Sequence, residues 1–538
     1  MSNVIHHLRA SADRNPDRPA LIMQDRDRAR PTTFAELWQK VDRCSTALKA
    51  EGFKPGERAI VMVPMSAELY IVMLGIIKMG GIAVFVDPWI SFKSISAFSA
   101  FAEPTAFIGV GKSHLLRLFQ KDLRRLPITV TTGISCYGIP AKSSLPKLLC
   151  RISGDGEIND ADPDSTALIT FTSGSSGTPK GANRTHRFLN AQYAALSHEF
   201  PYNDDDVDMP MFPVFALSNL ARGITSVIPD MDFRKVAEVN PAAISKQMET
   251  HGVTTCTASP PFFDRLSGYL REREDEPVGL RRILTGGAPV SSTQLQQWQL
   301  AFGKTLIEVV YGSTEAEPVA HIGAARRLEL SRQTETKNRG FCTGKPTSLL
   351  QTKIIMIFKG PIPSPPAWDE IELARGNVGE LLVSGDHVCR DYYKNPQALL
   401  ENKVVDQNGR VWHRMGDTGY MDDEGSFWLV GRLHSTIVRN DEQFHAQIIE
   451  QAVASKVKDA LQVAAIGMPD ESMGERIAVV IRAQTISFNA EEIREIMLAR
   501  HIPIDDVIYT THELPVDPRH NSKIDYDKLR ELIINNEL

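Results

Sequence analysis

Residues 171–181 read FTSGSSGTPKG, and this stretch predicts the fold of the chain. It holds three glycines, five hydroxyl residues and one lysine, and it follows an apolar run (residues 166–171) that indicates a buried strand. Such a loop can point several backbone N–H groups at a phosphate, while the hydroxyls add donors and the lysine adds positive charge. The stretch therefore predicts a phosphate-binding loop after a strand.

This loop does not match the Walker-type phosphate loop, G-x-x-x-x-G-K-[ST]. In the register that begins at Gly174, Pro179 stands where the second glycine is needed, and Gly181 stands where the Mg²⁺-binding hydroxyl is needed. A flexible surface linker is the other alternative. Linkers seldom follow a buried strand and end in Pro-Lys-Gly, so a phosphate-binding loop of another class is favoured.

Working outward, the chain reads as alternating strands and helices. Residues 33–52 predict a helix, and residues 58–64, 67–80 and 82–88 predict strand, helix and strand, a rhythm that favours parallel-sheet units. Further strand patterns lie at residues 224–230, 254–261, 281–289 and 305–315, and a helix is expected near residues 187–198. From about residue 376, short strands with Gly and Asp turns predict a β-rich segment, and a smaller αβ stretch follows residues 431–434.

Composition narrows the function classes. The 538 residues are 42% hydrophobic and 23% charged, and the net charge of −6 gives no general attraction to nucleic acid or anionic membrane. The six cysteines lack metal-ligand spacing and are expected to be single buried or semi-buried thiols of a reducing compartment. The N-terminus has no apolar signal core, and Glu68 and Lys78 interrupt the most apolar stretch, residues 61–86. We expect a cytoplasmic protein in which this stretch forms a core helix and a strand.

Five further motifs accompany the loop in a fixed order. They are GGAPV (residues 286–290), YGSTE (311–315), GDTGYMDDEG (416–425), GR (431–432) and PRHNSK (518–523). Together with [ST]-S-G-[ST]-[ST]-G-x-P-K-G, they resemble the signatures of the adenylate-forming superfamily: acyl-CoA synthetases, peptide-synthetase adenylation domains and luciferases. The resemblance covers nearly the whole chain. It implies a large α/β adenylation domain of layered subdomains with a β-rich subdomain (residues 1–431), and a small mobile αβ lid domain (residues 432–538).

The resemblance also implies the reaction and the site. A carboxylate attacks the α-phosphate of ATP, pyrophosphate leaves and an acyl-adenylate forms, with ATP and Mg²⁺ required. Thr314 would contact the α-phosphate, Glu315 would bind Mg²⁺, and Lys523 would bridge the carboxylate and the α-phosphate. The remaining nucleotide-binding positions would be Thr172, Ser173, Gly174, Ser175, Ser176, Gly177, Thr178 and Lys180 at the β- and γ-phosphates, Gly287, Ala288, Pro289, Tyr311, Gly312 and Ser313 at the adenine, and Asp417 and Arg432 at the ribose. Phe212, Phe215, Gly287 and Gly312 would line the acyl pocket.

Three positions depart from the general superfamily pattern. Phe215 stands where many acyl-CoA synthetases have a histidine, His434 replaces the usual Asp or Lys of the hinge, and Asp441 replaces a glycine that lets the CoA thiol approach. The bulk and charge of Asp441 argue against thioester formation. His186, just after the loop, could orient it or make a local structural hydrogen bond.

A subfamily accommodates these departures. The β-lactone synthetases of bacterial olefin biosynthesis resemble the chain in FPVFAL (residues 212–217), SVIPDMD (226–232), VWHRMGDTGY (411–420) and PVDPRHNSKI (515–524). That resemblance implies a 3-hydroxy fatty acid, whose hydroxyl closes on the activated carbonyl without a thiol, and other olefin-pathway enzymes as partners. The alternatives are an acyl-CoA or acyl-carrier-protein ligase, and a nucleotide- or acyl-binding protein that has lost catalysis.

Overall fold

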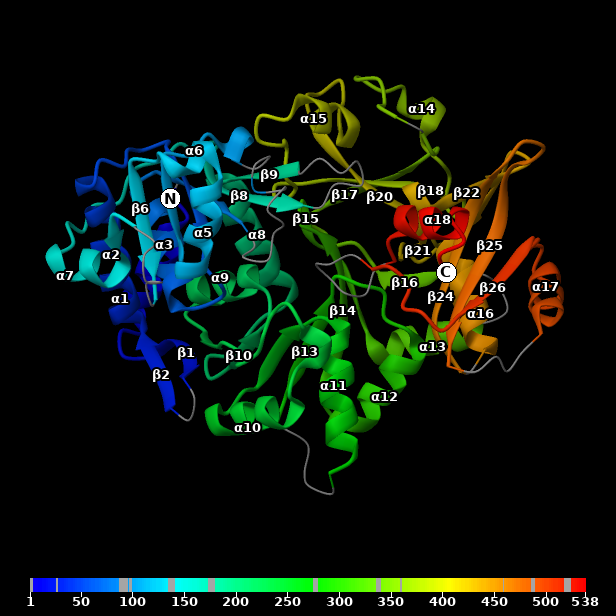
Figure 1. Ribbon diagram of the computed structural model, residues 1–538, viewed down its shortest axis with the longest axis horizontal. Helices are drawn as coiled ribbons and strands as arrows, with labels where there is room; N and C mark the ends of the chain where they lie inside the picture. Colours follow the sequence, from blue (N-terminus) through cyan, green and yellow to red (C-terminus); the bar gives the residue numbers. More distant parts are fainter. Residues whose placement is uncertain are drawn as a thin grey trace.

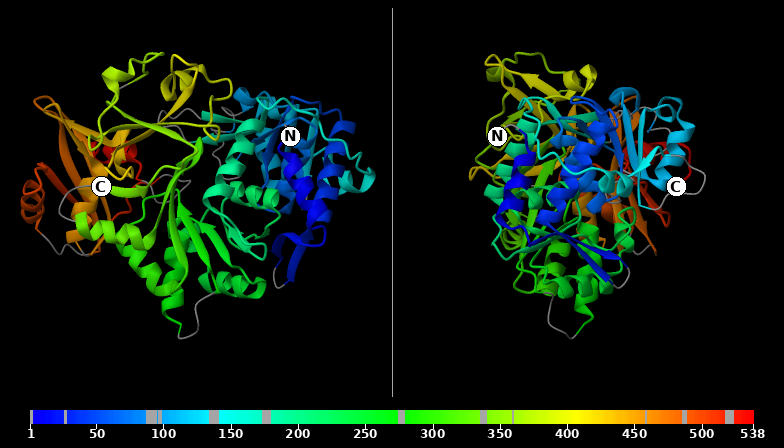
Figure 2. Two further views of the ribbon diagram at one scale, coloured as in Figure 1. Left: turned by 180° about the vertical axis from the view of Figure 1, so that it is seen from behind. Right: turned by 90° about the vertical axis from the view of Figure 1, so that its left-hand side faces the viewer.

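The fold is built on four β-sheets, and together they make the mixed α/β architecture that the sequence predicts. The computed structural model describes residues 3–25, 28–86, 95, 99–133, 141–172, 180–273, 279–334, 340–358, 360–457, 459–484, 489–516 and 524–538. The N-terminal sheets (blue to cyan) and the C-terminal sheet (orange to red) lie at opposite ends of the long axis (Figure 1), and the view from behind shows the same arrangement (Figure 2).

The first sheet holds the strand that precedes the glycine-rich loop. Its strand order is β7-β6-β5-β3-β4-β8-β9, parallel except for the antiparallel pair β8 and β9. The strands are β3 (Arg58–Met62), β4 (Ile82–Phe85), β5 (Ala106–Val110), β6 (Ile128–Thr132), β7 (Ser143–Ser144), β8 (Thr166–Thr172) and β9 (Lys180–Thr185). The helices of this region are α2 (Phe34–Ala50), α3 (Ala67–Lys78), α5 (Gly111–Phe119), α6 (Lys121–Arg124), α7 (Leu145–Arg151) and α8 (His186–Glu199).

The second sheet carries the adenine motifs predicted from the sequence. Its order is β15-β14-β13-β12-β10-β11-β1-β2, with the two edge strands antiparallel to their neighbours. The strands are β1 (Pro19–Asp25), β2 (Arg28–Thr33), β10 (Val207–Pro210), β11 (Thr225–Val227), β12 (Thr255–Ala258), β13 (Arg282–Gly286), β14 (Leu306–Ser313) and β15 (Ala316–Gly323). The helices are α1 (Ile5–Arg14), α9 (Pro213–Arg222), the 3₁₀ turn η1 (Val236–Glu238), α10 (Pro241–His251), α11 (Pro260–Arg271), α12 (Ser292–Phe302) and α13 (Ala324–Thr334).

The third sheet is the predicted β-rich segment, and it is antiparallel throughout. It runs in the order β16-β21-β20-β18-β17, and β19 pairs with β20. Its elements are β16 (Phe341–Gly344), β17 (Gln351–Ile355), α14 (Trp368–Ile371), β18 (Gly379–Ser384), α15 (Pro396–Asn402), β19 (Lys403–Val405), β20 (Val411–Met421) and β21 (Phe427–Arg432).

The fourth sheet begins just after Arg432 and has its own apolar core. Its order is β23-β22-β25-β24, with β26 parallel to β25. The elements are η2 (Leu433–Ser435), β22 (Thr436–Arg439), β23 (Glu442–His445), α16 (Ala446–Lys456), β24 (Ala460–Asp470), β25 (Gly474–Ala483), α17 (Ala490–Leu498), β26 (Asp506–Thr510) and α18 (Tyr526–Ile534). The division into domains at residues 431 and 432 stays a prediction, and we call residues 432–538 the small domain below.

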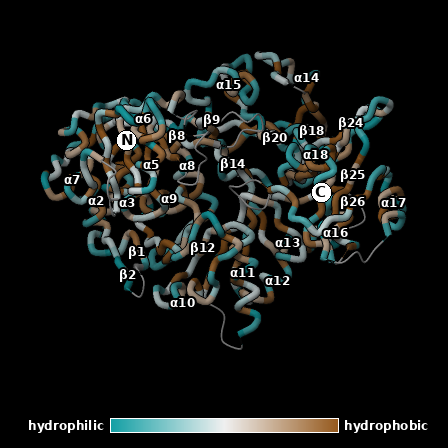
Figure 3. The backbone as a smooth tube through the Cα atoms, viewed as in Figure 1, coloured by the Kyte–Doolittle hydropathy of each residue, from teal (hydrophilic) through white to brown (hydrophobic). Residues whose placement is uncertain are grey.

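The apolar stretch of residues 61–86 forms a core helix and a strand, as predicted. All of α3 from Leu69 onward is buried, and brown segments fill the interior around it (Figure 3). Lys78 is completely buried, and its charge is compensated by Asp42 at 2.9 Å and Asp155 at 3.2 Å. Within the described residues, no helix combines the length and the apolar character that a membrane span requires.

The cysteine prediction holds for four of the five described thiols. Cys44, Cys256, Cys342 and Cys389 are buried, and Cys136 lies outside the described residues. Cys150 is exposed, contrary to the prediction, because it lies in the last turn of the short helix α7, whose buried residues are Leu145 and Leu148.

Candidate active site

Most of the motif residues that the structure describes line one cavity. Its volume is about 2640 Å³, and its wall contains residues of the first, second and third sheets and of the small domain. The turn after β13 and the end of β14 contribute where two neighbouring parallel strands end. The crevice at the carboxyl ends of parallel strands is where α/β proteins bind ligands.

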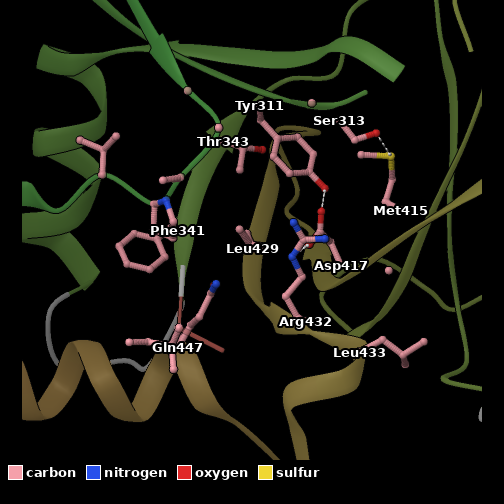
Figure 4. A pocket seen from close by; sticks show the side chains of 18 of the residues that line it. Tyr311, Ser313, Phe341, Thr343, Met415, Asp417, Leu429, Arg432, Leu433 and Gln447 are labelled. Atoms are coloured by element: carbon pink, nitrogen blue, oxygen red, sulfur yellow. Dashed lines mark hydrogen bonds and ion pairs between the residues drawn. The ribbon is translucent and has the colours of Figure 1, made fainter. Parts of the chain in front are cut away.

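Tyr311, Asp417 and Arg432 form a connected trio in this cavity. The Tyr311 hydroxyl donates to Asp417 Oδ2 at 2.6 Å, and Arg432 Nε forms an ion pair with Asp417 Oδ1 at 2.9 Å. Figure 4 shows the three side chains converging from β14, β20 and β21. Asp417 is almost completely buried, and its charge raises the pKa of Arg432. The trio presents a fixed carboxylate beside an aromatic ring, as the sequence predicts for an adenosine site.

The predicted adenine turn is shaped by two glycines. A Cβ on Gly286 would lie 2.6 Å from the Val310 carbonyl oxygen, and Gly287 has a φ of +81°, which favours glycine. Gly287, Ala288 and Pro289 then line the cavity with Gly312 and Ser313. The backbone can therefore pass close to β14 and leave room for a flat ligand.

Glu315 is a buried carboxylate beside two basic side chains. Its Oε1 accepts a hydrogen bond from the Tyr392 hydroxyl at 2.9 Å. Burial acts to raise the pKa of Glu315, but His413, Lys403 and the Tyr392 hydroxyl together hold the pKa below its ordinary value. Burial also lowers the pKa of His413 to about 3 and lowers the pKa of Lys403. Glu315 is thus an anion available to a cation in the cavity.

The ends of the glycine-rich loop are fixed by the β8–β9 pair. Thr172 lies opposite Lys180 in the register, and the Lys180 ammonium is 3.4 Å from Asn402 Oδ1. Lys180 lines the cavity on the side of Glu315 and His413. The predicted phosphate contacts Ser173, Gly174, Ser175, Ser176, Gly177 and Thr178 lie outside the described residues, as does Lys523.

The backbone of Thr314 is held in place by Arg184. The Thr314 carbonyl accepts from Arg184 Nη2 at 2.9 Å, and the same guanidinium lies over the Phe188 ring. The Arg184 charge also acts on Glu317, and both side chains line the cavity. Burial raises the pKa of Glu317 to about 7, with Arg184 opposing the shift.

The predicted acyl wall is apolar. Phe212 is the N-cap residue of α9, and Pro213 lies in the first turn of that helix. The Phe215 side chain is buried. The rings of Phe212 and Phe215 lie 6.2 Å apart and pack with Leu284 and Val310. Phe215, at the position where many acyl-CoA synthetases have a histidine, thus belongs to an apolar cluster.

The other two departures lie on the small domain. His434 is in η2 and lines the cavity, with its ring 6.4 Å from that of Tyr526. Asp441 and Asn440 form the exposed turn between β22 and β23, with φ of +65° and +50°. Both residues occupy the left-handed region, which matches a glycine-type turn.

His186 serves the local structural role. Its Nδ1 accepts from the Val4 backbone N–H at 3.2 Å, so the histidine connects α8 to the start of α1. Burial lowers the pKa of His186 to about 4, which keeps the ring neutral.

Sequence reasoning did not identify Arg184, Glu317, Tyr392, Lys403 or His413 as residues of the site. Arg184 lies four residues after the predicted contact Lys180, and Glu317 lies two residues after the predicted contact Glu315. That closeness in the sequence is the signal that could have identified them as residues of the site. Tyr392 and Lys403 belong to the β-rich segment outside any motif, and only the folded chain brings them to Glu315.

Comparisons with known proteins agree with this geometry. The family described as AMP-binding enzyme matches residues 8–393. An olefin beta-lactone synthetase of Stenotrophomonas maltophilia is 30% identical, over 92% of this chain and 90% of its own length. One from Xanthomonas campestris pv. campestris is 31% identical with the same coverage. A long-chain-fatty-acid–CoA ligase of Mycobacterium tuberculosis is 25% identical, over 92% of this chain and 91% of its own.

Solved structures have the same fold across the whole chain. ATP-bound MatB from Rhodopseudomonas palustris has a TM-score of 0.81 at 18% identity, and the match covers all of both chains. The amide bond synthetase McbA from Marinactinospora thermotolerans has a TM-score of 0.79 at 21% identity, covering 98% of this chain and 99% of its own. At these identities the likeness establishes the fold.

Proposed function

The chain belongs to the AMP-binding enzyme family and is an adenylate-forming ligase, and from this premise we propose that it converts a 3-hydroxy fatty acid, with ATP, to a β-lactone, AMP and pyrophosphate. The observation that carries the proposal is the cavity in which Tyr311, Asp417, Arg432, Glu315 and Lys180 meet beside an apolar wall. The two β-lactone synthetase relatives support the closure of the activated acid to a β-lactone.

In the first step, the acid's carboxylate attacks the α-phosphorus of ATP. Two anions must approach each other, so positive charge and fixed orientation lower the barrier. Lys180 and the loop before it would hold the β- and γ-phosphates, and Asp417 would accept hydrogen bonds from the ribose hydroxyls. Thr314 would contact the α-phosphate, held in place by Arg184. Lys523 would bring its charge to the developing bond.

The residues fit a Mg²⁺ ion at Glu315. No group of three His, Cys, Asp or Glu side chains is arranged to hold a metal in the part of the chain that the structure describes. A single buried carboxylate is nevertheless what Mg²⁺ uses at phosphate sites, where phosphate oxygens and waters complete its ligands. Bound there, the ion would neutralise phosphate charge during the displacement. Lys403 and Tyr392 keep the Glu315 carboxylate ionised and oriented.

In the second step, the 3-hydroxyl oxygen attacks the acyl carbonyl carbon. The bond from that carbon to the phosphate oxygen breaks, AMP leaves, the hydroxyl proton is released and a four-membered ring closes. The attack is intramolecular, so its high effective concentration helps offset ring strain. No thiol enters, which agrees with Asp441 in place of a glycine at the β22–β23 turn.

The test is incubation with ATP, Mg²⁺ and a long-chain 3-hydroxy acid, with and without CoA. A CoA-independent product one water lighter than the acid, formed with one AMP, supports the proposal. A thioester formed only with CoA would contradict the proposal and favour an acyl-CoA ligase, the class to which the Mycobacterium relative belongs by name. Replacing CoA by an acyl-carrier protein tests the remaining ligase alternative.

A further inference from the structure

One carboxylate that lines the cavity has no side-chain partner among the described residues. Glu317, near the start of β15, lines the cavity. Among the described residues, none donates a hydrogen bond to its carboxylate or forms an ion pair with it, and only its backbone carbonyl is engaged, by Gln192 at 3.4 Å. Among the described residues, Arg184 is the charge that acts on it. Glu317 is half-buried and lines the cavity, so its carboxylate is an acceptor available to a donor on a ligand.

Glu317 adjoins Gly312, which is one of the residues predicted to line the acyl pocket. A Cβ on Gly312 would lie 3.4 Å from the Glu317 Cβ, so the two residues are in direct contact. Arg184 links the same place to Thr314, whose carbonyl it binds. The reacting carbonyl must lie near Thr314 for adenylation, so Glu317 stands within a few atoms of it. The pocket beyond is apolar, with Phe215, Leu284 and Val310.

A polar acceptor near the reacting carbonyl, followed by an apolar wall, fits an acid with a hydroxyl close to its carboxyl group. We infer that Glu317 is a specificity-determining residue that accepts a hydrogen bond from the substrate's 3-hydroxyl and selects 3-hydroxy acids over plain fatty acids. This inference rests on the proposed function and names the side chain that recognises the 3-hydroxyl of the substrate. A plain acid would leave the carboxylate facing CH₂ groups, without a donor. A hydroxyl satisfies it and is oriented toward the carbonyl.

The experiment measures selectivity in the first step alone. Pyrophosphate release is followed with a 3-hydroxy acid and with the acid of equal length that lacks the hydroxyl, and the ratio of their kcat/KM values is the readout. Hydrogen bonds to charged groups contribute about 1.5–3 kcal/mol, so Glu317→Leu should lower the ratio about tenfold to a hundredfold. Glu317→Gln, which keeps an acceptor oxygen, should lower it less. Glu329→Gln, on the exposed face of α13, is the matched control.

Three outcomes are decisive. A lower ratio in Glu317→Leu with unchanged activity on the plain acid supports the inference. An unchanged ratio in a folded Glu317→Leu variant, or a wild-type ratio near one, overturns it. If Glu317→Leu does not fold, the Glu317→Gln ratio decides. Because pyrophosphate release precedes ring closure, absence of lactone from the wild-type enzyme would reject the proposed function while leaving this ratio measurable.

Discussion

At the residue scale, the site depends on charges that are compensated from distant parts of the sequence. Asp417 is paired with Tyr311 and Arg432, and Glu315 accepts from the Tyr392 hydroxyl beside the charge of Lys403. A buried carboxylate without such partners would protonate rather than stay charged. The motifs predict the acids themselves, whereas their partners come from other sheets.

The first prediction concerns Asp417. Asp417→Asn keeps the shape but removes the charge that pairs with Arg432 and that, in the proposed function, would accept hydrogen bonds from the ribose hydroxyls. Charge-assisted hydrogen bonds contribute about 1.5–3 kcal/mol, so kcat/KM for ATP should fall about tenfold to a hundredfold. Initial rates of AMP formation at varied ATP measure this. Asp423→Asn, at an exposed turn of the same segment, should leave the rate unchanged. An Asp417→Asn enzyme with wild-type kcat/KM would remove Asp417 from the nucleotide site.

At the element scale, the β22–β23 hairpin stores local backbone strain. Asn440 and Asp441 form its turn with positive φ at both positions, a conformation that glycine adopts at lower cost. The strain lies where the sequence departs from the glycine of CoA ligases.

The second prediction follows from this turn. Asp441→Gly should raise the free energy of unfolding by a few tenths to about 1 kcal/mol, because it removes the left-handed penalty. Chemical denaturation of the full chain measures it. Glu442→Gly, at the first residue of β23, should instead destabilise by roughly 0.5–1 kcal/mol. If Asp441→Gly is as destabilising as the Glu442 control, the turn is not strained.

The third prediction concerns His321 on β15, which joins two other elements. Its Nε2 is 3.0 Å from Glu199 of α8, and its Nδ1 is 3.1 Å from Glu308 of β14. The hydrogen bond to Glu308 comes first among the causes that raise the pKa of His321. A raised pKa means that the protonated ring stabilises the fold fully below about pH 6.5, and that this contribution is lost as the pH rises through the folded-state pKa.

Accordingly, wild-type protein should melt roughly 1–3 °C above His321→Gln at pH 6, and the difference should shrink at pH 9. Thermal unfolding at both pH values is the measurement. His512→Gln removes an exposed histidine that is remote in sequence from these carboxylates and should show no such pH dependence. Equal differences at both pH values would show that the imidazole does not titrate against these carboxylates.

At the scale of the whole molecule, the cavity belongs to neither end of the chain alone. Its wall includes β13, β14 and β20, and also η2, α16 and α18 of the small domain. The chain continues from Arg432, which pairs with Asp417, directly into η2. A change in the orientation of the small domain would therefore act on the Asp417–Arg432 pair.

The fourth prediction tests this dependence. Lys523→Ala should lower the rate of adenylate formation on the order of 10²–10³-fold, because a charge that stabilises the transition state is lost. ATP affinity, measured by calorimetry, should change far less. Lys304→Ala removes an exposed lysine between α12 and β14, outside the residues that line the cavity, and is the control. A Lys523→Ala enzyme that forms AMP at the wild-type rate would assign the catalytic charge to another residue.

Much of the fold was predictable because its signals are local. The helix predicted at residues 33–52 is α2, begun by a capping box between Thr33 and Glu36, and the predicted strands at residues 58–64 and 82–88 are the parallel pair β3 and β4. Polar contacts between sheets were not predictable. No local sequence pattern indicates that Arg184 donates a hydrogen bond to the Thr314 carbonyl, or that the Lys403 charge acts on Glu315. Those contacts depend on how the sheets pack.

The pairing of Thr172 with Lys180 has a consequence for ligand affinity. Bringing the two ends of a flexible loop together costs conformational entropy, and that cost rises with loop length. Here β8 and β9 hold both ends in register, so the cost is met when the sheet folds and not when a ligand arrives. A phosphate ligand therefore need not supply the free energy of bringing Thr172 and Lys180 together. The β8–β9 pair is in this sense an entropic preorganisation of the two ends of the segment FTSGSSGTPKG.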